Sequence, residues 1–350
     1  MMTTKNLLVE LFVEELPPKA LKMLGEAFAN TLFNVLAKHH LVLGAEIANT
    51  ESFASPRRLA VLIPDVLDRA PDRQESLKLL PVTVAFSNGQ ATPPLLKKLT
   101  SLGVQFADVK SQLERQVSEL REYLVLDREV SGATLVQGLQ TALEEAIAKL
   151  PIPKVMSYQL ETDCELPGWS SVHFVRPAHG LVALHGSTVV PVKALGLTAG
   201  NSTQGHRFEA AVSPVLLKDA DSYAATLLKD GAVIASFAER KAEIARQLAA
   251  AAAKVGGGAR PIEDEALLDE VTALVERPNV LVCEFEKQFL DVPQEWFDTL
   301  MDLVGGRTGQ SLSLGDKGPV AAALERGAGN LNELLGYDRG HSVRFAITSE

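Results

Sequence analysis

The chain has 350 residues, of which 46% are hydrophobic and 22% charged, and its formal net charge is −10 at pH 7. This length predicts two or three domains with buried cores, and the ordinary apolar fraction argues against intrinsic disorder. The excess of acidic residues excludes a protein that binds nucleic acid through overall positive charge, although a local basic patch stays compatible with RNA binding.

Cysteine content and apolar runs indicate a cellular location. The two cysteines, Cys164 and Cys283, can form neither a disulfide framework nor a four-sulfur zinc site, so we expect buried, reduced thiols. The first apolar run is interrupted at Glu10 and again at Glu14, and no stretch of about 18 apolar residues occurs. We therefore expect neither a signal peptide nor a membrane span, and a soluble, cytoplasmic protein.

The first elements are predicted from their hydrophobic periodicity. Apolar residues alternate over residues 7–13, which predicts a strand with one buried face. Pro17 and Pro18 end this strand and suit the first turn of a helix. Apolar residues then recur at steps of three and four over 19–38, which predicts an amphipathic helix, and a second strand is expected over 59–63.

The segment from about residue 70 to 150 is more polar and mixed. We expect a helix near 95–102, a strand around 123–130 and a helix near 135–150. Two prolines in the four residues 151–154 then predict a linker, because proline resists regular structure.

The following part of the chain is rich in predicted strand. A β-rich run covers 173–192, and a loop of Gly, Ser and Thr follows at 196–205. Ser236 begins a long helix as the first residue of a capping box. A further helix is expected over 267–275 and a strand over 280–285.

The C-terminal end differs in composition. Residues 302–350 hold 9 of the 25 glycines, and hydrophobic periodicity weakens there. We therefore expect an α+β protein with three regions. These are an N-terminal α+β region at 1–150, a β-rich α+β region with C-terminal helices at 151–300, and a divergent Gly-rich tail at 301–350.

No catalytic or metal-binding motif is apparent. The seven histidines form no H-x-x-x-H or H-E-x-x-H pattern, so no metal site is predicted. Two glycines at 200–205 have Walker A spacing, but His206 and Arg207 replace the Lys and Ser/Thr of that motif, which argues against a P-loop NTPase. A flexible connecting loop and a phosphate contact through backbone and arginine both stay open for this segment. With no G-x-S-x-G motif either, no catalytic residue is predicted.

Three arginines beside strands are candidate phosphate contacts. Arg57 and Arg58 stand at a turn directly before a strand, and Arg176 stands at a strand end before a proline. A guanidinium held at such a position suits bidentate contacts to phosphate or carboxylate. The alternative is a structural ion pair with one of the many acidic residues.

Six segments in a fixed order identify a family resemblance over about residues 7–300. They are LFVEELPPKAL, FASPRRLAVL, FVRPAHGLVALHGSTVVPV, the loop that ends in GHRF, SFAERKAEI and LLDEVTALVERPNVLV. Together they resemble the β subunit of bacterial heterotetrameric glycyl-tRNA synthetase. Their shared order supports this resemblance more strongly than any single motif.

The resemblance implies a fold and a function. The N-terminal region would be similar to the B3/B4-type domains of the phenylalanyl-tRNA synthetase large subunit. The chain would be a non-catalytic β subunit of glycine–tRNA ligase, a cytoplasmic aminoacyl-tRNA synthetase of protein biosynthesis. It would support ATP-dependent attachment of glycine to tRNA(Gly) within a heterotetramer of two α and two β subunits. ATP and Mg²⁺ would bind the α subunit, with no cofactor and no autonomous activity on this chain.

The sequence departs from the family pattern after about residue 300. Arg277 replaces the tryptophan of the family's VEWP motif, Asp302 follows Met301 where the family has lysine, and the His-Asp dipeptide of an HD-like domain does not occur. We interpret the chain as the N-terminal half of a β subunit, from truncation or a shifted reading frame. The family's anticodon-binding domain would then be missing, and tRNA binding would be weakened.

The resemblance also assigns candidate tRNA or phosphate contacts. They are Arg57, Arg58, Arg176, His206 and Arg207. Two alternatives to the ligase function stay open. One is a truncated, non-catalytic remnant that folds but does not support aminoacylation, and the other is a stand-alone hydrolase, for which the sequence offers no metal or nucleophile constellation.

Overall fold

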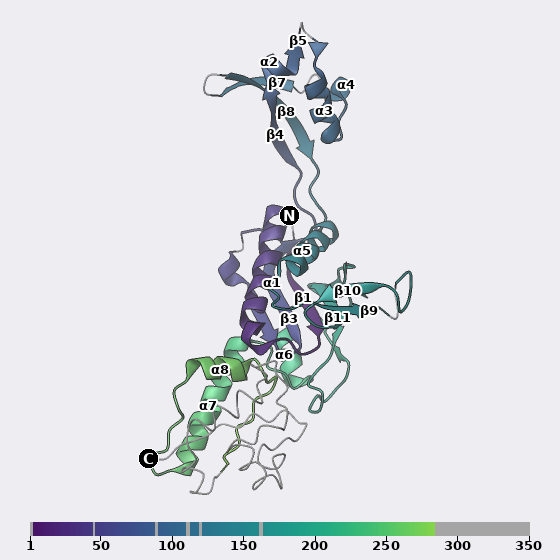
Figure 1. Ribbon diagram of the computed structural model, residues 1–350. Coiled ribbons are helices and arrows are strands. Elements are labelled where there is room, and N and C mark those ends of the chain that lie inside the picture. Colours follow the sequence, from purple (N-terminus) through teal and green to yellow (C-terminus); the bar gives the residue numbers. More distant parts are fainter. Residues whose placement is uncertain are drawn as a thin grey trace, which may run out of the picture. The chain divides into compact units, whose positions relative to one another are not determined.

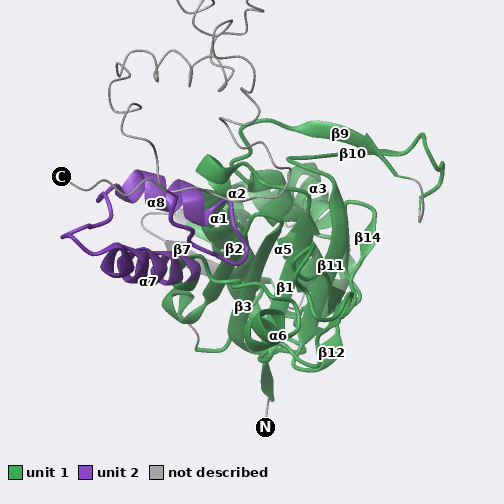
Figure 2. Ribbon diagram, turned by 90° about the horizontal axis from the view of Figure 1, so that it is seen from below, with its two compact units in different colours: residues 1–239 green, residues 240–350 purple. Residues whose placement is uncertain are grey.

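The structure, a computed structural model, describes most of the first 283 residues. The described ranges are 3–44, 46–87, 90–109, 113–118, 121–160 and 164–283. The chain divides into two units, residues 1–239 and residues 240–350 (Figure 2). Every ladder between described strands is antiparallel, and helices occur in both units, so the predicted α+β class is confirmed.

The first unit contains a five-stranded sheet with three helices. In chain order these elements are β1 (Thr4–Val13), α1 (Pro18–Lys38), β2 (Glu51–Ser55), β3 (Arg58–Leu67), α5 (Leu135–Lys149), β11 (Ala178–His185), β12 (Thr188–Val189) and α6 (Tyr223–Lys229). The strand order is β12-β11-β1-β3-β2, so β1 is central; Figure 1 labels β1, β3 and β11, and Figure 2 labels all five strands. The predicted strands and helices in these segments are confirmed, with β3 longer than expected.

Helices cover both faces of this sheet. On one face α1 packs closely, because a Cβ at Gly25 would lie only 2.7 Å from the Cβ of Ala54 in β2. The neighbouring Phe53 packs edge-on against Tyr223 of α6, with 5.1 Å between the ring centroids. Successive residues of a strand point to opposite faces, so α1 and α6 lie on opposite sides of the sheet.

Strand β1 is therefore buried on both faces, and the prediction of one buried face is wrong. Leu7 and Val9 are fully buried on one side, and Leu8 and Glu10 are fully buried on the other. The alternation in the sequence placed Glu10 at the solvent, but a central strand between two layers has no solvent face. A buried carboxylate on this strand needs polar partners inside the protein.

Residues 73–130 form an insertion between β3 and α5 with a core of its own. Its elements are β4 (Arg73–Pro81), α2 (Val82–Ala85), β5 (Phe86–Ser87), β6 (Gln90–Ala91), α3 (Pro93–Ser101), α4 (Phe106–Val109), β7 (Leu113–Ser118) and β8 (Arg121–Val130). Leu95, Leu99 and Leu126 are fully buried in this core. The polar segment of the sequence is thus a small folded module, in which α3 and β8 confirm the expected helix and strand.

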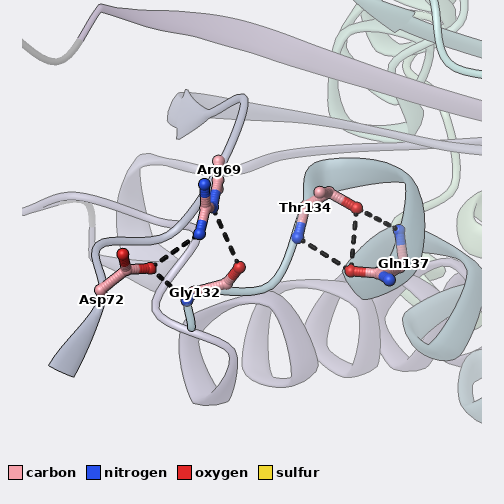
Figure 3. Close-up of polar contacts among 5 residues, drawn as sticks. All are labelled: Arg69, Asp72, Gly132, Thr134 and Gln137. Carbon is pink, nitrogen blue, oxygen red and sulfur yellow. Dashed lines mark hydrogen bonds and ion pairs between the residues drawn. The ribbon is translucent and has the colours of Figure 1, made fainter. Parts of the chain in front are cut away.

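A hydrogen-bonded neck joins the two chain segments that enter and leave the insertion. Arg69 Nη2 and the Gly132 N–H each donate to Asp72 Oδ1 at 2.8 Å (Figure 3). Next to this neck Thr134 is the N-cap of α5, and its hydroxyl accepts a hydrogen bond from the Gln137 N–H at 3.4 Å. The start of α5 is therefore fixed beside the neck by a capping box.

The remaining strands of the first unit are short. They are β9 (Met156–Gln159), β10 (Ser171–Phe174), β13 (Lys193–Ala194), β14 (Leu197–Thr198), β15 (Ser202–Thr203) and β16 (Val215–Leu216). The linker expected at 151–154 lies in the irregular connection between α5 and β9. This connection joins two parts of one unit, because β11 pairs with β1 in the same sheet, and the chain divides at residue 239.

Two further helices follow at the end of the described chain. They are α7 (Phe237–Val255) and α8 (Glu265–Thr272), as the sequence predicts, and the Ser236 hydroxyl accepts a hydrogen bond from the Glu239 N–H at 3.3 Å. Of the strand expected over 280–285, the described part is irregular, and the rest lies outside the described residues, as does the tail at 301–350.

The structure also bears on the predictions for the two cysteines and for a membrane span. The prediction that both thiols are buried is wrong, because Cys164 is half-buried and Cys283 is exposed. Cys164 lies in an irregular loop rather than in the core. The prediction used only the separation of the two cysteines in the sequence, which does not determine whether either thiol is buried. None of the helices in the described ranges combines the length and the apolarity needed to cross a membrane.

Candidate functional site

Arg57 and Arg58 lie at the turn between β2 and β3 and belong to the interior. The side chain of Arg58 is fully buried, and Arg57 is 9% exposed. The guanidinium carbons lie 5.3 Å and 5.6 Å from the centroid of the Phe12 ring on β1, a cation–π arrangement. Burial of this kind suits a positioning role better than direct contact with a ligand.

These two arginines hold a loop that comes about 150 residues later in the chain. Their Nη2 atoms donate to the carbonyl oxygens of Gly205 and Gln204, each at 2.8 Å. The preceding Thr203 donates its hydroxyl hydrogen to the buried Glu10 carboxylate, which also accepts a hydrogen bond from the Tyr223 hydroxyl. The three successive residues 203–205 are thus tied to the central sheet and its β2–β3 turn, and nothing in the sequence marks Glu10 as the partner of Thr203.

His206 shapes the turn that follows. Its backbone N–H donates to the Gly231 carbonyl at 2.6 Å, and its ring Nδ1 accepts from the N–H groups of Phe208 and Glu209 at 3.3 and 3.2 Å. Gly205 is required here, since a Cβ would lie 2.6 Å from the Gly231 carbonyl oxygen. The half-buried imidazole is therefore part of the backbone structure of the turn.

Arg207 and Phe208 are the solvent-facing residues of this turn. Phe208 is 75% exposed, and Arg207 is exposed as well. Within the described ranges, no residue forms a hydrogen bond or an ion pair with the Arg207 side chain. We call residues 203–208 the arginine turn, and Arg207 is its cation available to a ligand.

Arg176 forms its hydrogen bonds with residues outside the arginine turn. It is half-buried after β10, and its Nε donates to the Glu15 carbonyl at 2.9 Å while Nη1 donates to the Val175 carbonyl at 3.1 Å. These bonds fix it to the backbone through carbonyl groups, whereas the alternative predicted an ion pair with a carboxylate.

The chemistry of the arginine turn is that of a binding surface. Arg57, Arg58 and Arg207 gather around it, together with the acidic residues Glu10 and Glu209 and with Asp230, whose carbonyl accepts hydrogen bonds from the Ala211 and Val212 N–H groups. Among the residues that the structure describes, no group of three or more His, Cys, Asp or Glu is placed to hold a metal ion. The arrangement suits an anionic ligand.

Comparison with known proteins gives a consistent result. The family model of the glycyl-tRNA synthetase beta subunit matches residues 7–303. The glycine–tRNA ligase beta subunit of Polaromonas naphthalenivorans is 63% identical over 339 residues, which cover 92% of this chain and 47% of the relative. That of Paracidovorax citrulli is 63% identical over 296 residues (84% and 41%), and that of Delftia acidovorans is 58% identical over 334 residues (92% and 46%).

The extent of these matches is also informative. The chain spans about half the length of the curated relatives it matches. The family match ends at residue 303, close to the limit expected near residue 300, whereas the alignments with the Polaromonas and Delftia proteins cover a larger share of the chain.

Proposed function

Because the chain belongs to the family of glycyl-tRNA synthetase β subunits, we propose that it acts as the β-subunit component of a glycine–tRNA ligase. In this function it supports the ATP-dependent attachment of glycine to tRNA(Gly) together with a separate, catalytic α subunit. The observation that carries the proposal is the family match over residues 7–303, which includes nearly every described residue of both units.

The proposed division of labour places the chemistry on the partner. ATP and Mg²⁺ bind the α subunit, which activates glycine, and this chain contributes surface for the α subunit and for tRNA. The arginine turn supports this division, because it combines a rigid frame with an exposed cation and carries no catalytic group. The assembly would be a heterotetramer of two α and two β subunits in the cytoplasm.

The proposed RNA contacts differ in strength of support. Arg207 is exposed on a rigid turn, which supports direct contact with a phosphate. Arg57 and Arg58 are buried and hydrogen-bonded to the turn, which supports an indirect role in positioning Arg207. His206 shapes the turn, and Arg176 is the second, more distant candidate, held by backbone carbonyls.

Association with the α subunit tests the proposal. We expect the purified chain to form a complex with the α subunit of the same organism, measured by size-exclusion chromatography with light scattering. We also expect the chain alone to show no glycine-dependent ATP–pyrophosphate exchange. A chain that stays separate from the α subunit would support the alternative of a folded remnant, and exchange activity of the chain alone would contradict the proposed division of labour.

A further inference from the structure

Phe208 is an aromatic residue held in solvent by a rigid backbone. Its side chain is 75% exposed, yet its N–H donates to His206 Nδ1, and the Ala210 N–H donates to the His206 carbonyl at 3.2 Å. A little further on, the Ala211 N–H donates to the Asp230 carbonyl at 2.9 Å. Hydrogen bonds on both sides therefore fix the backbone that carries this ring.

The charge beside this ring favours an anionic partner. Arg207 precedes it in the exposed part of the turn, and the buried Arg57 and Arg58 lie beneath the same turn. A cation adjacent to an exposed ring is the pair of groups that single-stranded nucleic acid requires, since bases stack on aromatic rings while guanidinium groups bind phosphate.

We propose that Arg207 and Phe208 form a contact site for one unpaired ribonucleotide. The base stacks on the Phe208 ring, and the Arg207 guanidinium donates hydrogen bonds to the adjacent phosphate. This inference rests on the proposed function, which provides tRNA as the RNA ligand, and it adds Phe208 to the residues that the sequence marked as candidates. The buried arginines act here as positioning residues, because they fix the turn without reaching the ligand.

A protein partner would use this segment differently. Val212 and Leu216 are also exposed, at 53% and 67%, and an apolar protein surface would cover them together with Phe208. A stacked base would cover Phe208 alone, with Arg207 at its phosphate. Leu216 is therefore the matched control, since it is an exposed apolar residue of the same segment outside the proposed site.

The test compares two RNAs with the full 350-residue chain. One is a stem–loop with a short unpaired tail that contains 2-aminopurine, and the other is the same stem–loop with a blunt end. Stacking on an aromatic side chain contributes roughly 1–3 kcal/mol per base, so we expect Phe208→Ala to weaken binding of the tailed RNA about 5- to 150-fold and to leave blunt RNA nearly unchanged. Phe208→Trp should keep the affinity and the quenching of 2-aminopurine, and Leu216→Ala should behave as wild type.

Arg207→Gln provides a second readout. We expect it to weaken binding of the tailed RNA and to lower the slope of log affinity against log salt by about 0.7, the value for one phosphate contact with a single strand. Because both side chains are exposed, thermal unfolding of each variant should match that of the wild type.

Several results would overturn the site. Equal affinity of wild type and Phe208→Ala for the tailed RNA would do so, as would equal losses in Phe208→Ala and Leu216→Ala. Loss of α-subunit binding in Phe208→Ala with unchanged RNA affinity would assign the ring to a protein contact. If the wild type binds the α subunit but Phe208→Ala keeps its RNA affinity, this inference alone fails. If the wild type binds neither the α subunit nor RNA, both this inference and the proposed function fail.

Discussion

At the residue scale, buried charged residues of the first unit hold the arginine turn in place. Glu10, on the central strand, accepts hydrogen bonds from Thr203 and Tyr223, and Arg58 donates to a loop carbonyl. Buried charged groups are costly unless hydrogen bonds satisfy them. The arrangement therefore makes the position of the arginine turn depend on residues that a ligand never touches.

Burial predicts opposite effects for two arginine variants. Arg58→Gln should lower the free energy of unfolding by about 1.5–3 kcal/mol, because it removes the fully buried, charged donor of the hydrogen bond to the Gln204 carbonyl. Arg207→Gln should change it by less than about 0.5 kcal/mol, because that side chain is exposed. Chemical denaturation measures both, with RNA titrations of the folded proteins alongside.

Each of the two variants has an outcome that would contradict the role assigned to its arginine. A stable Arg58→Gln protein would show that the buried guanidinium does not hold the turn. An Arg207→Gln protein that binds RNA like the wild type would remove the direct phosphate contact.

At the element scale, the neck of the insertion depends on a glycine that leaves no room for a side chain. A Cβ at Gly132 would lie 1.7 Å from the carbonyl oxygen of Ala70, so the backbone itself must move. We expect Gly132→Ala to lower the free energy of unfolding by about 1–3 kcal/mol, the usual range for overpacking. Gly200→Ala is the control, since nothing lies within 4 Å of its Cβ position, and its stability should not fall. Equal stability of the two variants would contradict this account of the neck.

The pair of helices α7 and α8 gives a prediction for pH. Lys241 Nζ lies 2.5 Å from Asp269 Oδ1 and 2.5 Å from Glu265 Oε1, and hydrogen bonds to Asp269 and then Glu265 raise the pKa of Lys241 above its ordinary value of 10.5. A raised pKa in the folded state adds stability that is complete below the unfolded pKa and is lost as pH rises through the folded pKa.

Lys241→Gln should therefore be less stable than the wild type near neutral pH, by less than about 1 kcal/mol for so exposed a network. The difference should disappear as the pH rises beyond 10.5. Lys254→Gln on the same helix is the control, because the Lys254 side chain forms no hydrogen bond or ion pair with any described residue. A stability difference between Lys241→Gln and the wild type that grows above pH 10.5 would contradict this prediction.

The elements that the sequence predicted well are those whose signals are local. Helix α1 repeats its apolar residues over five turns, and its first residue follows a proline, so both period and start are visible. The second buried face of β1 was missed because the partners of Glu10 lie about 200 residues away. The insertion read as a polar segment because a small module buries a smaller fraction of its surface.

The candidate site shows the same limit. Arg57 and Arg58 precede a strand, as the sequence indicates, but their acceptors are backbone carbonyls of a distant loop. A carbonyl group occurs at every residue, so no residue type marks it in advance. The aromatic Phe208 stood within the GHRF segment, but only its 75% exposure distinguishes it from a core residue.

At the scale of the whole molecule, an acidic chain presents the exposed Arg207 on a hydrogen-bonded turn. A net charge of −10 opposes diffuse binding of RNA, so the few cations available must be well placed. The family match covers the described residues of both units from residue 7 onward, and the proposed function connects this surface to glycine attachment.

Glycylation of tRNA(Gly) tests the central claim most directly. The α subunit is held constant, this chain is added in increasing amounts, and the rate of [¹⁴C]glycine attachment to tRNA(Gly) is measured with ATP and Mg²⁺ present. We predict that the rate rises with added chain and saturates when the subunits are equimolar, while neither subunit alone attaches glycine. A rate that does not change at any amount of added chain would contradict the claim that it supports aminoacylation.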